Sequence, residues 1–387
     1  MYIRDIEFEQ GVSCFLFGPR GTGKTFWLRH VFPEGAYIDL LEAKTFNTLS
    51  ADPQRIDRWL PGSNSVPVII DEIQKLPILL DEVHRLIENG QHWFILTGSS
   101  ARKLRRSGVN LLGGRALTKH LHTLTASELG PDFDLGMALS YGLLPTIYDQ
   151  KKKVPPEAYL QSYIQTYLKE EVYQEGLTRN LGAFSRFLEA ASFSQAQLLN
   201  ISAVARECQI KRKLAESYFQ ILEDLLLAIR VLPFERRARR RITLHSKFFL
   251  FDVGVFRAVR PCGPLDSSKE IDGPALETLV LQHLRPVMAK RLAPDSIYYW
   301  RTASGMEVDF VVYHGNVFTA IEVKRKRSID SRDLTGLRAF HDEYPQARRV
   351  LIYGGDRLER IGDILAVPFT EALFSMEKLI NGTLGTR

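Results

Sequence analysis

The sequence predicts an α/β protein with three parts: an N-terminal domain built on a parallel sheet, a helical middle region and a C-terminal α/β domain. Short apolar runs alternate with helical stretches through the first third, which is typical of a parallel sheet covered by helices. A mostly helical region then extends from residue 156 to about residue 230. Mixed helix and strand patterns return from about residue 263, so the expected domains are 1–130, 131–262 and 263–387.

Length and composition set the broad class of the protein. A chain of 387 residues is too long for one ordinary core, so two or three domains are expected. Its 45% hydrophobic and 25% charged residues are typical of a folded globular protein. No apolar run approaches the roughly 18–20 residues that cross a bilayer, the first residues lack a signal-peptide pattern, and the three cysteines are widely spaced. We therefore expect a cytoplasmic protein without membrane contact.

The N-terminal domain contains a phosphate-binding pattern. The segment GPRGTGKT (18–25) satisfies GxxxxGK[ST] and stands between an apolar strand and a helical stretch. Its glycines allow backbone N–H groups to surround phosphate oxygens, and the following helix N-terminus adds a favourable dipole. Lys24 should reach the β- and γ-phosphates of ATP, and the Thr25 hydroxyl should ligate Mg²⁺. The expected nucleotide-binding residues are Gly18, Pro19, Arg20, Gly21, Thr22, Gly23, Lys24, Thr25 and Asp71.

Acidic and hydroxyl side chains follow the next apolar strands. Asp71 ends the strand VPVIID, where its carboxylate can hold Mg²⁺ through water, and Glu72 could polarise the attacking water. An acid pair at this place favours hydrolysis of ATP over transfer to a small acceptor, although acids also end ordinary strands. After the strand WFILTG, either Thr97 or Ser99 could place a hydroxyl near the γ-phosphate, or both could belong to a structural turn.

Arg115, in LLGGRAL, could act as an arginine finger on the nucleotide of a neighbouring subunit. That role would require a homo-oligomer, and the alternative is a surface arginine beside a glycine turn. Together the segments FGPRGTGKT, IIDEIQKLP, FILTGSSARKL and LLGGRA resemble AAA+-type P-loop ATPases. They resemble more narrowly the prokaryotic branch with a C-terminal domain of unknown function. One departure is HTLTASELG, with threonine where that branch usually has proline, which concerns local packing.

The middle region contains a candidate DNA reader. Residues 203–207 predict a short helix, CQI a turn, and residues 211–227 a longer helix that starts with three basic residues. The arginine-rich ERRARRRITL follows where a wing would lie, so the segment resembles a winged helix. This resemblance continues through Lys247 and Asp252 in HSKFFLFDVGVFRAV. DNA is the expected partner, in line with the net charge of +6, and the alternative is a packing module.

Charged residues interrupt two apolar strands near the C-terminus, in MEVDFVVYHGNVFTAIEVKRKR (306–327). Two-residue periodicity places Glu322 and Lys324 on one face of a strand. A hairpin that turns at YHGN could bring Asp309 near Glu322. Upstream, an amphipathic helix over GPALETLVLQHL carries Glu277, and Pro286 is expected to kink or end that helix.

These four residues suggest phosphodiester chemistry. Asp309 and Glu322 could hold Mg²⁺ against a scissile phosphate, while Lys324 could orient or deprotonate water. The pattern resembles the PD-(D/E)xK nuclease superfamily, with Glu277 as its helical acid. The resemblance implies a restriction-endonuclease-like fold and a metal-dependent nuclease. The alternative is an inert module, held by a salt bridge from Lys324 to Glu322 or Asp309, that binds a partner under control of the ATPase.

Overall fold

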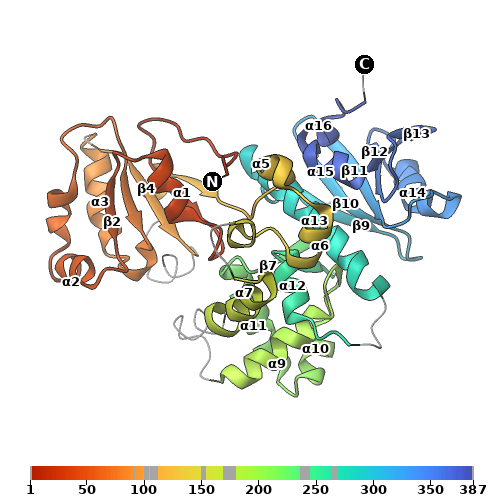
Figure 1. Ribbon diagram of the computed structural model, residues 1–387, viewed down its shortest axis with the longest axis horizontal. Coiled ribbons are helices and arrows are strands. Elements are labelled where there is room, and N and C mark those ends of the chain that lie inside the picture. Colours follow the sequence, from red (N-terminus) through yellow and green to blue (C-terminus); the bar gives the residue numbers. More distant parts are fainter. Residues whose placement is uncertain are drawn as a thin grey trace. The chain divides into compact units, whose positions relative to one another are not determined.

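The computed structural model describes residues 2–90, 92–99, 104, 112–149, 154–168, 180–235, 245–263 and 268–385. The chain forms two compact units (Figure 1). The N-terminal unit comprises Asp5–His122 and Asp224–Leu227. The C-terminal unit comprises Met1–Arg4, Thr123–Glu223 and Ala228–Arg387, so it holds most of the expected middle region together with the expected C-terminal domain.

The N-terminal unit is built on a parallel sheet with the strand order β2-β3-β4-β1-β5. Its strands are β1 (Cys14–Phe17), β2 (Ala36–Asp39), β3 (Val68–Asp71), β4 (Phe94–Gly98) and β5 (Leu117–His120). Its described helices are α1 (Lys24–Val31), α2 (Ala43–Ala51) and α3 (Leu79–Glu88), with short 3-10 turns at Pro53–Trp59, Ile73–Lys75 and Leu112–Gly114. The predicted parallel α/β fold of this unit is confirmed.

The side chains of β1 point alternately to the two faces of this sheet, and helices cover both faces. Phe15 and Phe17 point to the side on which α3 packs, and Cys14 and Leu16 point to the side on which α1 packs. All four side chains are buried, as expected for a central strand between two helical layers. This packing fixes the carboxyl end of β1, from which the phosphate-binding segment leaves the sheet.

The C-terminal unit is built on a second sheet with the strand order β13-β14-β12-β11-β10-β9-β7-β8-β6. Its strands are β6 (Gln197–Leu198), β7 (Ala228–Pro233), β8 (Lys247–Leu250), β9 (Ile297–Arg301), β10 (Glu307–His314), β11 (Val317–Lys324), β12 (Arg348–Tyr353), β13 (Glu359–Ile361) and β14 (Ile364–Pro368). The parallel pairing of β7 with β9 joins strands of the expected middle region to those of the expected C-terminal domain.

Helices surround this second sheet. They are α5 (Ala126–Leu129), α6 (Leu135–Tyr141), α7 (Pro156–Ser162), α9 (Leu181–Ser192), α10 (Ile201–Glu207), α11 (Arg212–Asp224), α12 (Val253–Val259), α13 (Ser268–Lys290), α14 (Thr335–Glu343), α15 (Phe369–Phe374) and α16 (Met376–Asn381). Shorter helical turns lie at Gly130–Asp132, Pro145–Tyr148, Tyr163–Leu168 and Ser331–Leu334. The helix α14 packs on β10 and β11, where Leu337 and Phe340 are buried against Val308 and Val311.

The predicted helix pair of the middle region is present as α10 and α11. The side chain of Asn200 caps α10 by accepting a hydrogen bond from the backbone N–H of Ala203. Lys211, Arg212 and Lys213 are exposed at the start of α11. The predicted wing falls almost entirely on residues 236–244, which lie outside the described residues.

The helix that carries Glu277 differs from its prediction in two ways. It does not end at Pro286, because α13 continues to Lys290. It is also not amphipathic: Leu279 and Leu281, two residues apart and so on opposite sides of the helix, are both buried. The reason is that α13 is packed against β9 and β11 and also against α6, α12 and α16. A helix covered on several sides is apolar all round, and such neighbours hold it together despite the N–H that proline lacks.

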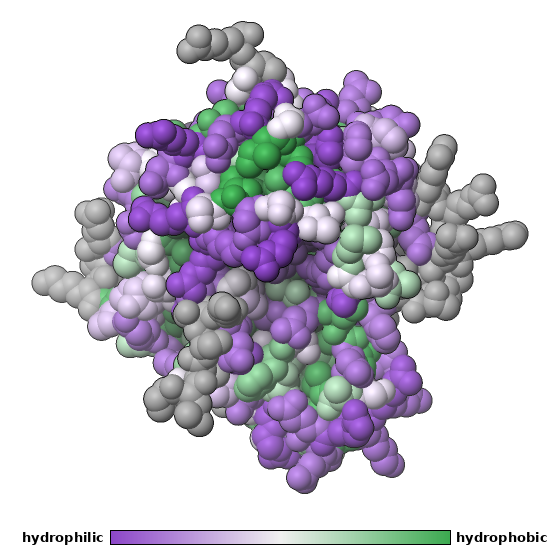
Figure 2. All heavy atoms as spheres, turned by 90° about the vertical axis from the view of Figure 1, so that its right-hand side faces the viewer, coloured by the Kyte–Doolittle hydropathy of each residue, from purple (hydrophilic) through white to green (hydrophobic). Residues whose placement is uncertain are grey.

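Figure 2 shows one face of the molecule, on which hydrophilic residues surround smaller hydrophobic areas. Within the described ranges, no helix has both the length and the apolar character that crossing a bilayer requires.

Candidate functional site

The phosphate-binding segment joins β1 to α1 and has the backbone that its glycines permit. Gly21 and Gly23 both have φ of 85°, in the left-handed region that favours glycine. Gly18 lies so close to the backbone of Leu121 that a Cβ would come within 2.3 Å of that carbonyl oxygen. Lys24 is buried, and its ammonium group donates to the carbonyl oxygens of Gly18 at 2.7 Å and Pro19 at 3.3 Å. The Lys24 ammonium group is therefore held against the backbone of the loop.

The ends of β3 and β4 meet the start of α1. The Thr25 hydroxyl donates to Oδ2 of Asp71 at 2.6 Å, and the Thr97 hydroxyl donates to Oδ1 of the same carboxylate. The Thr97 oxygen also accepts from the backbone N–H of Glu72 at 3.3 Å. Asp71 and Thr97 are buried. The two expected Mg²⁺ ligands of this unit, Thr25 and Asp71, are thus side by side, and Thr97 orients the carboxylate.

Glu72 follows directly after the strand with an uncommon backbone conformation. Its φ is 58°, in the left-handed region that is uncommon for residues other than glycine. Its carboxylate accepts a hydrogen bond from the side-chain amide of Gln74, which also donates to the Ser99 hydroxyl at 3.3 Å. Gln74 was missed by sequence reasoning. The only signal was a polar residue two positions after Glu72, and the bare Cα of Gly98 gives its side chain room.

The candidate arginine finger lies on the surface of the N-terminal unit. Arg115 follows the turn Leu112–Gly114, and 41% of its side chain is exposed. Its guanidinium group pairs with the carboxylate of Glu88 at the end of α3. An exposed arginine in this position is accessible to a second subunit, and the finger role remains a prediction.

In the C-terminal unit, β10 and β11 form the expected antiparallel hairpin, with Phe310 opposite Ile321 and His314 opposite Val317. Asp309 is buried, and its Oδ2 accepts a hydrogen bond from the backbone N–H of Val323 at 2.9 Å. The carboxylate of Glu322, also buried, pairs with the Lys324 ammonium group. The hairpin therefore brings three of the four predicted residues together, and α13 adds Glu277.

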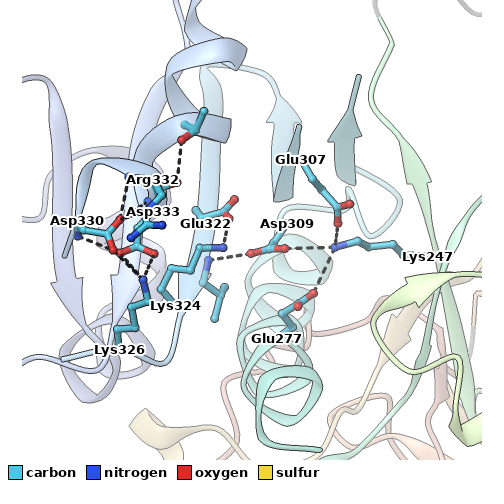
Figure 3. A network of polar contacts seen from close by, with 12 residues as sticks. Lys247, Glu277, Glu307, Asp309, Glu322, Lys324, Lys326, Asp330, Arg332 and Asp333 are labelled. Carbon is cyan, nitrogen blue, oxygen red and sulfur yellow. Dashed lines mark hydrogen bonds and ion pairs between the residues drawn. The ribbon is translucent and has the colours of Figure 1, made fainter. Parts of the chain in front are cut away.

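A second lysine, which the sequence did not single out for this site, is at the centre of the acids (Figure 3). Lys247 opens β8, and only 2% of its side chain is exposed. Its ammonium nitrogen is 3.3 Å from Oε2 of Glu277 and 3.3 Å from Oδ1 of Asp309, and it also contacts Glu307. A lysine this deeply buried needs acidic partners, but its burial depends on strand pairing and no local pattern in the sequence shows it.

Carboxyl groups outnumber ammonium groups in this cluster. Glu307 is shared with Arg301 at 3.2 Å, which leaves three inner carboxylates against two ammonium groups. The inner carboxylates belong to Glu277, Asp309 and Glu322, and the ammonium groups to Lys247 and Lys324. Oε2 of Glu322 is buried and has no hydrogen-bond partner among the described residues. With every carboxylate ionised, the cluster would carry one negative charge more than its two lysines neutralise, next to an orphaned carboxylate oxygen.

The pKa values of the cluster follow from this arrangement. Burial and the neighbouring Asp309 carboxylate raise the pKa of Glu277 to about 8. The same two causes raise the pKa of Glu322 well above its ordinary value. Burial by itself would lower the pKa of Lys247, but its carboxylate partners outweigh that effect and raise it. Additional positive charge would therefore stabilise the ionised forms of both glutamates.

The donor set suits a magnesium ion that keeps most of its own water ligands. Among the described residues, no group of three or more His, Cys, Asp or Glu side chains is arranged to hold a metal ion. Mg²⁺ commonly binds through one or two carboxylates, with waters and substrate phosphate completing its shell. Asp309 and Glu322 provide that pair. Gly336 packs against this end of β10, since a Cβ there would come within 2.0 Å of the backbone oxygen of Glu307.

The basic segment after β11 is largely paired with acids. Arg325 contacts Asp272 at 2.9 Å, and Lys326 contacts Asp330 at 3.0 Å and Asp333 at 2.9 Å, as Figure 3 shows for Lys326. Lys324 differs from these residues, because it pairs with Glu322 in the acidic cluster. Its side chain is 34% exposed. It is the lysine that both belongs to the site and reaches solvent.

The parallel sheet and the glycine-rich loop after β1 give the N-terminal unit the architecture of a P-loop nucleotide-binding domain. Residues 11–130 match a family model described as an AAA domain. Residues 132–266 match the domain of unknown function DUF8612, and residues 272–372 match the domain of unknown function DUF4143.

Two relatives are similar along most of the chain. They are the uncharacterized proteins Mb2031c of Mycobacterium bovis and Rv2008c of Mycobacterium tuberculosis. Each is 26% identical over 368 residues, which cover 92% of this chain and 80% of the relative. A solved structure, the Aeropyrum pernix ORC1 protein in complex with DNA, aligns over 64% of this chain and 86% of that chain. Its TM-score of 0.25 and 14% identity are too low to carry a conclusion.

Proposed function

We propose that the protein binds ATP with Mg²⁺, hydrolyses it, and uses this cycle to act on DNA through the C-terminal unit. The observation that carries the ATPase half is the contact between the Thr25 hydroxyl and the Asp71 carboxylate, directly below the loop that holds Lys24. Mg²⁺ bound there would neutralise charge on the β- and γ-phosphates. ATP turnover by the wild-type chain and by a Glu72→Gln variant tests this half.

The residues of the chain have separate tasks in this reaction. Lys24 exchanges its carbonyl partners for phosphate oxygens, and the backbone N–H groups of Gly18–Gly23 bind the same phosphates. Glu72 takes a proton from the attacking water, and Gln74 holds the Glu72 carboxylate in place. Arg115 of a neighbouring copy stabilises charge on the γ-phosphate in a homo-oligomer.

We propose that the second half of the function is metal-dependent cleavage of a DNA phosphodiester bond at Asp309, Glu322 and Lys324. The orphaned Oε2 of Glu322 and the excess of carboxyl groups over ammonium groups support a cation at this place. Asp309 and Glu322 would hold Mg²⁺, which when bound acidifies water and neutralises charge on the phosphate. Lys324 orients the attacking water, and Glu277 acts from α13 by positioning Lys247 and, through it, Asp309.

A second candidate function rests on the same cluster. Lys247 and Lys324 already pair with the acids, which is the arrangement of an inert module that binds a partner while the ATPase acts as a switch. The cleavage assays on the Asp309 site separate the two candidates, because the inert module hydrolyses ATP and leaves DNA intact.

DNA binding is expected at the start of α11. A triple variant, Lys211→Glu with Arg212→Glu and Lys213→Glu, should weaken binding to duplex DNA strongly, because three exposed positive charges become negative. The slope of log affinity against log salt should also fall by about 0.9 for each phosphate contact that is lost. Fluorescence anisotropy at several salt concentrations measures both quantities.

The matched control for this triple variant reverses Arg55 and Arg58, which are exposed on the N-terminal unit. It should retain the affinity and salt slope of the wild type. Equal affinity of the α11 variant and the wild type would show that this helix does not contact DNA.

A further inference from the structure

Lys247 has an uncommon position for a lysine, because it supplies a cation to acids from other parts of the fold. It comes from β8, Glu277 from α13, and Glu307 and Asp309 from β10. Figure 3 shows its ammonium group in the middle of these three carboxylates. Because its side chain is 2% exposed, it cannot reach a DNA substrate directly.

The Asp309 carboxylate already has two partners, one for each of its oxygens. Its Oδ1 is 3.3 Å from Lys247 and its Oδ2 accepts from the N–H of Val323 at 2.9 Å. Glu322, the other proposed metal ligand, lies one strand away, and its Oε2 has no hydrogen-bond partner among the described residues. A divalent ion at Asp309 and Glu322 would share the Asp309 carboxylate with an ammonium group of the same sign, and like charges at such short range repel each other.

We propose that Lys247 is a resident cation of the acidic site that competes with a divalent metal ion for Asp309 and keeps the metal affinity of the site low. This inference rests on the proposed metal site of the C-terminal unit. Its consequence is that two carboxylates bind the ion only weakly. Oxygen ligands from a DNA phosphate are then needed to complete the shell, as is usual for Mg²⁺.

The test is the affinity for Mn²⁺ without nucleotide, measured by calorimetry on the full chain. Lys247→Gln removes the charge but can still donate hydrogen bonds to the carboxylates, and Lys247→Arg keeps the charge. Lys247→Gln should bind Mn²⁺ on the order of tenfold more tightly than the wild type, because one nearby positive charge is gone. Lys247→Arg should resemble the wild type. Lys119→Gln, in the N-terminal unit, is the control for removal of a lysine paired with an acid.

The second readout is thermal unfolding, which covers the case that the variant is less stable. Mn²⁺ should raise the melting temperature of Lys247→Gln more than that of the wild type, and Asp309→Asn in the same background should abolish the difference. Equal or weaker Mn²⁺ binding by a folded Lys247→Gln protein would overturn the role of Lys247 while leaving the metal site in place. If neither the wild type nor any Lys247 variant binds Mn²⁺, the proposed metal site itself is wrong.

Discussion

Replacing Glu72 with glutamine should reduce the turnover number for ATP by at least about 100-fold, the usual scale for loss of a general base. Binding should persist, because Lys24, Thr25 and Asp71 are unchanged and still interact with each other and with the loop. The glutamine side chain of this variant keeps the shape of the glutamate but cannot accept the proton of the attacking water. Steady-state ATPase assays and binding of a fluorescent ATP analogue measure the two effects separately.

Two further variants serve as comparisons for the Glu72→Gln result. Lys24→Ala should lose binding as well as turnover, because the Lys24 ammonium group is expected to bind the β- and γ-phosphates. Glu34→Gln, at an exposed position of the same unit, should behave like the wild type. A Glu72→Gln protein that hydrolyses ATP at the wild-type rate would remove Glu72 from the proposed chemistry.

Replacing Asp309 with asparagine should abolish Mg²⁺-dependent cleavage of DNA, a loss of at least about 100-fold on the scale of removing an electrostatic group from an active site. The carboxylate is a proposed metal ligand and a direct partner of Lys247. The asparagine side chain of this variant retains an oxygen that can accept from the Val323 N–H, so the hairpin should stay paired. Cleavage of end-labelled DNA in Mg²⁺ or Mn²⁺ gives the rate.

The matched control for this substitution is Asp333→Asn. Asp333 is also a buried acid paired with a lysine, Lys326, but it belongs to the turn after β11 and not to the acidic site. Its replacement should leave cleavage unchanged. ATP hydrolysis should continue in both variants, which shows that the N-terminal unit is intact. Cleavage that survives Asp309→Asn would point to another site or a contaminating nuclease.

The nucleotide site could be predicted because its residues belong to short sequence motifs at the ends of recognisable strands. The turn of Gly18–Gly23 follows from glycine spacing, and Asp71 and Glu72 stand at the end of a strand whose apolar run is unmistakable. Gln74 could not be assigned, since its importance depends on Ser99 and Gly98 at the end of another strand. Hairpin pairing likewise followed from the two apolar runs that carry Asp309 and Glu322 and from the turn between them.

The role of Lys247 could not be predicted, because its position among the acids depends on which strands pair in the folded chain. Lys247 is 30 residues before Glu277 and 62 before Asp309 in sequence. It reaches them only because β8 pairs with β7 and β7 pairs with β9 in the sheet that also holds β10. The amphipathic character predicted for α13 was wrong for a similar reason: α6 and α12 of the middle region pack on this helix in addition to strands of the sheet.

DNA cleavage in Mg²⁺ with and without ATP, by the wild type, Lys24→Ala and Lys324→Ala, tests whether ATP and the acidic site act together. We expect ATP to stimulate cleavage by the wild type and not by Lys24→Ala. Lys324→Ala should not cleave DNA, while its ATP hydrolysis continues. Intact DNA under every condition, together with normal ATP hydrolysis by the wild type, would contradict the proposed cleavage and favour a switch with an inert C-terminal site.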